Sequence, residues 1–149
     1  MKIYKHCIFI VISAVAILAY LNMGSIASSK EKHFIDKWVE EQIAKDPSTA
    51  GEIQAYAKGS DMWDKELNKV YRELMNKLDN NQRVALQEAQ INWIKFRDAD
   101  HKAINLIIQG LEGTMWLPVP EARLYKIIPQ RAMELKDYLE WTELYSRTH

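Results

Sequence analysis

The densest group of potential metal ligands in the sequence is Asp98, Asp100 and His101. A metal site needs at least three ligands that converge, but residues two positions apart on a helix face different directions. No Gly-x-Ser-x-Gly elbow surrounds a serine, phosphate-cradling glycine motifs are absent, and no pair of carboxylates stands out for glycoside hydrolysis. The sequence therefore predicts a protein that is not an enzyme and that uses no metal or cofactor.

A set of polar residues placed among apolar ones could instead recognise a partner or order the fold. The set consists of Asn68 and Tyr71 on one helical segment, and Gln90, Trp93, Arg97 and Asp98 on the next. Asn68 could face Gln90 or Arg97 across a helical hairpin. One interpretation is a buried network that pairs Arg97 with an acid and fixes the register of two helices. The other places Arg97 and Asp98 in a binding surface.

Residues 110–120 form a further candidate for recognition. They contain two glycines and two prolines and show no helical period, which predicts a loop of roughly ten residues. Glu112, Met115 and Trp116 would be presented there on a frame stiffened by proline. Tryptophan is a common hot-spot residue, and a stiff loop loses less entropy on binding. The alternative is that Trp116 folds back over the open end of the protein.

Helices must position these residues, because helical spacing runs through most of the chain. A first helix is expected over 32–45, ended by Asp46-Pro47. A second helix starts at a capping box in residues 49–52 and continues to Leu78. A short break or kink is expected in it at Gly59-Ser60. Residues 79–81 read as a turn, followed by a third helix over 82–109. Two long helices joined by so short a turn must run antiparallel.

The last helix is expected from about Glu121, with Pro129 kinking or restarting it. No strand-like alternation is found. The fold class predicted is therefore all-α: a small helical bundle built on a long antiparallel αα-hairpin and preceded by an N-terminal signal helix. Tryptophans on the helical stripes are expected to be core anchors, with Trp116 as the exception.

The N-terminus indicates export. Lys2 and Lys5 precede an uncharged apolar run over 7–21, and Ser25 and Ala27 are the small residues that a signal peptidase reads. We expect a signal peptide over 1–27 and one helical domain over 28–149, in the periplasm or cell envelope. The alternative is an uncleaved anchor, which would be the only contact with a membrane.

The composition of the expected mature chain limits its partners and its chemistry. Of the 20 basic and 20 acidic residues in the whole chain, the signal holds Lys2 and Lys5 and no acid, which leaves 18 against 20. This balance supplies no basic field of the kind that drives nucleic-acid binding. Cleavage would also remove the single cysteine, Cys7, so the domain must fold without disulfides.

Two stretches resemble the signature of the LprI-type lysozyme-inhibitor family, also described as DUF1311-like. One is Leu-Asn-x-x-Tyr at 67–71, and the other is Ala-Gln-x-x-Trp-Ile-x-Phe-Arg-Asp at 89–98. The similarity covers roughly 43–139, more weakly through 113–114 and 130–135. The motif residues are Leu67, Asn68, Tyr71, Gln90, Trp93, Arg97 and Asp98. Family members usually carry cysteines in the first helical region, after the Arg-Asp pair and in the last helix, and this chain has none there.

The resemblance implies an envelope binding protein that blocks a lysozyme or an endogenous cell-wall hydrolase by protein–protein contact. The residues expected to bind that partner are Glu112, Met115, Trp116, Arg97 and Asp98. Two alternatives remain: a structural or assembly factor of the envelope that uses the outer face of the hairpin for partner helices, or an immunity protein against a toxin that degrades the wall.

Overall fold

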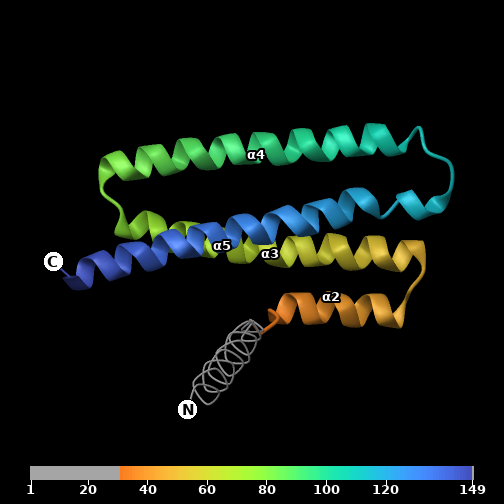
Figure 1. Ribbon diagram of the computed structural model, residues 1–149, viewed down its shortest axis with the longest axis horizontal. Helices are drawn as coiled ribbons and strands as arrows, with labels where there is room; N and C mark the ends of the chain where they lie inside the picture. The colour runs from red at the N-terminus through yellow and green to blue at the C-terminus, as the bar shows by residue number, and fades with distance from the viewer. Residues whose placement is uncertain (1–30, 149) are drawn as a thin grey trace, which may run out of the picture. The chain divides into compact units, whose positions relative to one another are not determined.

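The computed structural model describes residues 31–148, so the predicted signal peptide lies outside the described part of the chain. The compact unit that begins at His33 contains four long α-helices (Figure 1). They are α2 (Phe34–Lys45), α3 (Thr49–Lys77), α4 (Asn80–Ile108) and α5 (Val119–Thr148), with a short 3-10 helix η1 (Thr114–Trp116) before α5. Residues 31–148 contain no strand, and none of their helices is both long and apolar enough to span a membrane. The predicted all-α fold is confirmed.

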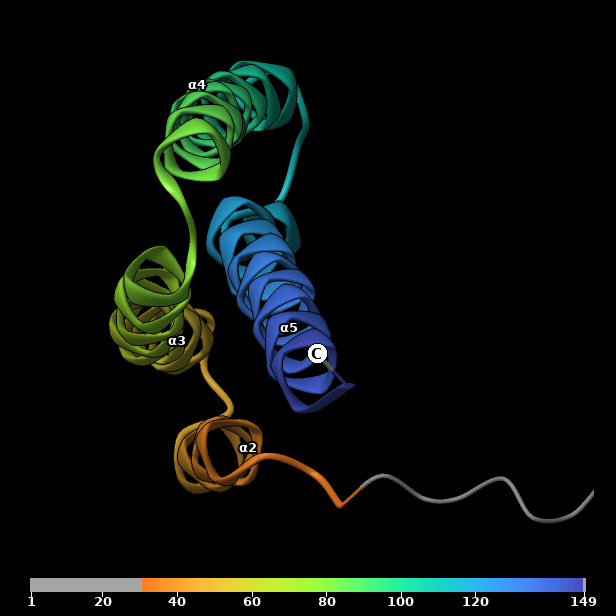
Figure 2. The same cartoon turned by 90° about the vertical axis from the view of Figure 1, so that its left-hand side faces the viewer.

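Successive helices run in opposite directions, so α5 is parallel to α3 (Figure 1). The core lies mainly between α3 and α5, which share the most extensive interface, and α2 packs against α3. Figure 2 shows α2 and α4 on opposite sides of the pair formed by α3 and α5. Helices α3 and α4 are joined by a short turn and run antiparallel as predicted, but they scarcely touch each other, and each packs on α5 instead.

The fully buried side chains explain why α3 and α5 pack together. Trp63, Leu67 and Leu74 of α3 recur at helical spacing and are at most 2% exposed, and they meet a buried stripe of α5 formed by Ile128, Ala132 and Leu135. In α4 only Leu86 and Gln90 are buried, so this helix contributes little to the core.

The helix starts differ from the predicted ones by one or two residues. Ser48, not Thr49, is the N-cap of α3, and its hydroxyl accepts a hydrogen bond from the Gly51 amide at 3.1 Å. A complete capping box is present at the start of α4 instead, where Asp79 and Gln82 each accept from the other's backbone amide.

The expected break at Gly59-Ser60 is wrong, because α3 is continuous from Thr49 to Lys77. Gly59 serves close packing between helices. A Cβ at this position would lie 2.5 Å from Cγ2 of Val39 in α2 and 2.9 Å from a ring carbon of Tyr125 in α5. Only glycine lets the three helices approach so closely here.

Helix α5 also continues through Pro129 without restarting, as a single helix of 30 residues.

The prediction that the tryptophans on the helical stripes are core anchors is only partly confirmed: Trp63 is 1% exposed, but Trp141 near the end of α5 is 61% exposed. The ring of Trp141 lies 5.4 Å from that of Tyr138, centre to centre, and both side chains line a surface groove. Trp141 is therefore not a core anchor.

Asp36 of α2 joins three helices through one carboxylate oxygen. Its Oδ1 accepts a hydrogen bond from Nε1 of Trp63 in α3 at 3.1 Å, and another from the hydroxyl of Tyr125 in α5 at 2.5 Å. Burial raises the pKa of Tyr125, and the hydrogen bond to Asp36 raises it further. This junction positions α2 against the main helix pair.

Candidate functional site

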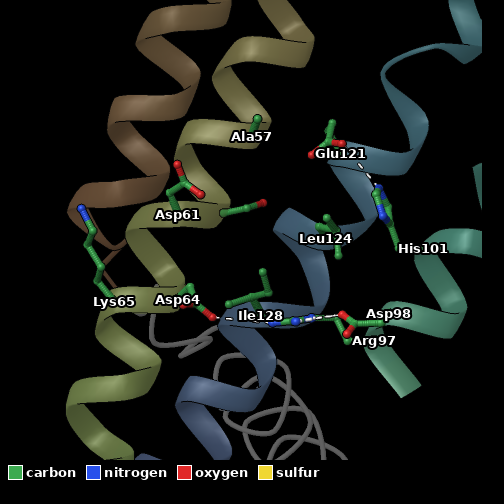
Figure 3. Close-up of a pocket in the computed structure, with 11 residues that line it drawn as sticks. Ala57, Asp61, Asp64, Lys65, Arg97, Asp98, His101, Glu121, Leu124 and Ile128 are labelled. Carbon is green, nitrogen blue, oxygen red and sulfur yellow. Dashed lines mark hydrogen bonds and ion pairs between the residues drawn. The ribbon is translucent and has the colours of Figure 1, made fainter. Parts of the chain in front are cut away.

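A charged cavity of about 390 Å³ lies where α3, α4 and α5 meet, and it contains part of the family motif (Figure 3). Helix α3 supplies Ala57, Ser60, Asp61, Asp64 and Lys65, α4 supplies Arg97, Asp98 and His101, and α5 supplies Glu121, Leu124 and Ile128. The three helices therefore bring together side chains that lie up to 71 positions apart in the sequence.

Arg97 is held on the wall of this cavity by two carboxylates. Its Nη2 lies 2.8 Å from Oδ1 of Asp98, to which its Nε also donates at 2.9 Å, and its Nη1 lies 3.7 Å from Oδ1 of Asp64 (Figure 3). The guanidinium also lies 5.6 Å from the centre of the Trp93 ring, within the range of a cation–π contact. The expected pairing of Arg97 with an acid is thus present, although the network opens onto the surface.

The predicted contact of Asn68 with Gln90 or Arg97 is wrong. Asn68 is exposed, and its Nδ2 donates to the backbone carbonyl and to Oδ2 of Asp64, one turn earlier on the same helix, both at 2.8 Å. It therefore reaches Arg97 only through Asp64. The i to i+4 geometry of the helix satisfies the amide locally, which removes the need for a partner across the hairpin.

Gln90 instead bonds to a residue that the sequence pattern did not indicate. Arg131 of α5 is 7% exposed, and its Nε donates to Oε1 of Gln90 at 3.0 Å. Its Nη1 pairs with Glu134 at 3.0 Å. Of the other motif residues, Leu67 is buried in the core and Tyr71 packs against it. Gln90, Leu67 and Tyr71 therefore act in the fold of this chain.

The cluster Asp98, Asp100 and His101 does not converge. Asp98 pairs with Arg97, Asp100 accepts from Nε of Arg123 at 2.8 Å, and Nε2 of His101 lies 3.4 Å from Oε1 of Glu121. Within residues 31–148 no group of three or more His, Cys, Asp or Glu side chains could hold a metal ion. The last two pairs instead link α4 to α5.

The loop between α4 and α5 presents an apolar tip. Met115 is 72% exposed, Leu117 and Leu111 are also exposed, and Trp116 is 37% exposed. Gly113 adopts φ 95°, the left-handed conformation that glycine favours, just before η1. Glu112 is exposed beside it. Trp116 therefore neither projects fully nor folds entirely back onto the helices.

The loop tip and the Arg97–Asp98 pair do not form one site. Arg97 lies eleven residues before the end of α4, which corresponds to roughly 16 Å of helix. The candidate residues therefore belong to two separate surfaces: a charged cavity along the helices, and an apolar tip at the end of the bundle, where the α4–α5 connection lies (Figure 1).

These features define a small all-α protein with a charged interhelical cavity and an exposed apolar loop. A profile of the family described as "Lysozyme inhibitor LprI" matches residues 40–135. The chain belongs to the LprI lysozyme inhibitor family, which confirms the resemblance seen in the motif residues. A search of curated proteins found no match.

Among solved structures, the chain is similar to the crystal structure of an uncharacterised protein from Burkholderia thailandensis. The TM-score is 0.70 at 21% sequence identity, and the match covers 77% of this chain and 58% of that chain. The present chain thus spans less than two thirds of that protein. At this level of identity the likeness concerns the fold alone.

Proposed function

We propose that this protein is an exported binding protein of the cell envelope that blocks a lysozyme or another cell-wall hydrolase by protein–protein contact, without chemistry of its own. The observation that carries the proposal is the family match over residues 40–135. The basic and apolar pattern of residues 1–27 supports export to the periplasm or envelope.

The apolar loop tip supports the mode of contact. Met115 and Trp116 expose apolar area at the end of the bundle, and Glu112 adds a charge beside them. Exposed apolar clusters mark interaction sites, and a tip at the end of a rigid bundle suits a concave partner. Arg97 and Asp98 would provide a second, polar contact along the helices.

The test is to capture lysozymes and endogenous wall hydrolases on the purified protein and to measure lysis of cell walls. Near-stoichiometric inhibition that is lost in Trp116→Ala supports the proposal. Trp141→Ala is the matched control, because it removes a tryptophan that is even more exposed, 61% against 37%, and lies near the other end of α5. Loss of inhibition in Arg97→Ala would show that the cavity surface also belongs to the interface. Failure to bind any hydrolase would contradict the proposal.

A second candidate function is a non-inhibitory assembly factor, and the outward side of α4 favours it. Apolar side chains that are exposed there are Val84, Ile91, Ile94, Phe96, Leu106 and Ile107. Such a surface fits a partner helix. Crosslinking from Ile91 or Phe96 to an envelope protein, combined with no effect on any hydrolase, would support this function. An immunity protein against a wall-degrading toxin is a variant of the inhibitor and would show binding to that toxin alone.

A further inference from the structure

The cavity between α3, α4 and α5 carries an excess of negative charge. Its four carboxylates, from Asp61, Asp64, Asp98 and Glu121, face two permanent cations, from Lys65 and Arg97. Arg97 already pairs with Asp64 and Asp98. Of the other two acids, Asp61 lies on α3, and Glu121 lies on the opposite wall, on α5, where its Oε1 is 3.4 Å from Nε2 of His101 (Figure 3). A cavity with this balance attracts a cation.

Buried polar atoms on the same walls have no hydrogen-bond partner. Ser60 is 6% exposed, lines the cavity, and its hydroxyl forms no hydrogen bond. Nε2 of His101 is also buried and lies near Glu121 without the alignment of a hydrogen bond. Buried polar groups are nearly always paired, so an orphaned hydroxyl on the same helix as Asp61 indicates a missing hydrogen-bond partner, and its oxygen can accept an N–H group.

The remaining wall of the cavity suits an organic cation. Ala57, Leu124 and Ile128 form an apolar patch beside the acids. The acids are too dispersed to ligate a metal ion, since no qualifying group occurs in the described helices. Basic side chains combine these needs, because their charged head seeks carboxylates while their aliphatic stem packs on apolar surface.

We propose that this cavity binds a guanidinium or ammonium group carried on an aliphatic stem. Asp61 and Glu121 pair with the cation, the hydroxyl of Ser60 accepts one of its N–H groups, and Leu124 and Ile128 cover the stem. The source is either a lysine or arginine side chain of a protein partner or a free basic amino acid. The site is separate from the loop tip, so the proposal does not require that the protein inhibit a hydrolase.

The experiment is an NMR titration of the purified full chain with Nα-acetyl-arginine amide, in the absence of any hydrolase. We expect saturable shifts of the backbone amides of Ser60, Asp61 and Glu121. The neutral isostere Nα-acetyl-citrulline amide should give none. Free L-arginine is the third arm: tighter binding than that of the blocked compound assigns the site to a free amino acid, and equal or weaker binding assigns it to a protein side chain.

Two variants test the named contacts. Asp61→Asn should raise the Kd about tenfold because a charge-assisted hydrogen bond is lost, and Ser60→Ala should raise it several-fold. Asp137→Asn, an exposed acid of α5 outside the cavity, is the control and should leave the Kd unchanged.

Equal binding of the citrulline compound overturns the proposal. So do shifts that map outside the cavity, and the absence of any shift up to the solubility limit of the probe. If the protein binds no hydrolase but binds the arginine compound in the cavity, the proposed function is refuted and the cavity proposal stands.

Discussion

Replacing Asp36 with alanine should destabilise the bundle by about 2–4 kcal/mol. The change removes one acceptor that serves two donors, Nε1 of Trp63 at 3.1 Å and the hydroxyl of Tyr125. Each hydrogen bond to a charged group contributes roughly 1.5–3 kcal/mol. Trp63 is 1% exposed, so its N–H could not bond to water in place of Asp36. The loss of this hydrogen bond should therefore cost nearly its full value. Tyr125 is only partly buried and its hydroxyl can turn to water, which lowers its share.

The measurement is urea unfolding followed by circular dichroism, with Asp137→Ala as an exposed control. Asp36→Asn keeps an acceptor oxygen in place and should cost less than half as much as Asp36→Ala. In a double-mutant cycle, Asp36→Ala and Tyr125→Phe should couple by at least about 1 kcal/mol, because they remove the same hydrogen bond. A cost no larger than that of the control, or additivity within about 0.5 kcal/mol, would refute the role of this junction.

Three further changes test the packing and the buried polar contacts. Gly59→Ala should destabilise the fold by about 1–3 kcal/mol through overpacking, whereas Gly110→Ala, whose Cβ would lie at an ordinary 3.6 Å from its nearest neighbour, should change the unfolding midpoint little. The raised pKa of Tyr125 means that folding favours the protonated phenol, which adds to the free energy of unfolding. This added stability is complete below the ordinary tyrosine pKa of about 10 and is lost as the pH rises above it. Unfolding measured from pH 9 upward should therefore show a decline that is smaller in Tyr125→Phe. Arg131→Met should destabilise the fold by about 1–3 kcal/mol, because it leaves the buried amide of Gln90 unpaired. In the same unfolding assay, the double change Arg131→Met with Gln90→Met should cost less than the sum of the two single changes.

The sequence was sufficient to predict the helices, the turn at Asp79 and the family, because periodicity and capping residues act locally. It did not predict contacts between residues distant in sequence. Asp36 meets Tyr125 across 89 positions, and Arg131 meets Gln90 across 41. Such pairings depend on how each helix is rotated about its axis, which an apolar stripe defines only to within about a residue.

Two expectations, at Gly59 and Asn68, are wrong for opposite physical reasons. Gly59 was expected to interrupt α3 because glycine weakens an isolated helix, but the neighbouring helices need the space that it leaves. Asn68 was expected to reach across the hairpin because it lies among apolar residues, yet a carboxylate one turn away satisfies it. At Gly59 a tertiary contact outweighed the local preference, whereas at Asn68 a local i to i+4 contact replaced the expected tertiary one. On the cavity walls, Arg97 and Asp98 belong to a motif that the sequence shows, whereas Ser60, Asp61 and Glu121 belong to none.

The shallow burial of α4 has a consequence for access to the cavity. This helix buries only Leu86 and Gln90, and near its far end ion pairs from Asp100 and His101 tether it to α5. Partly exposed ion pairs weaken in salt, and elements with few buried contacts open locally before the whole protein unfolds. We therefore expect α4 to open locally while the other three helices stay packed, which would widen the cavity. The contacts proposed for the ligand lie on α3 and α5, so opening of α4 would admit the ligand without breaking any of them.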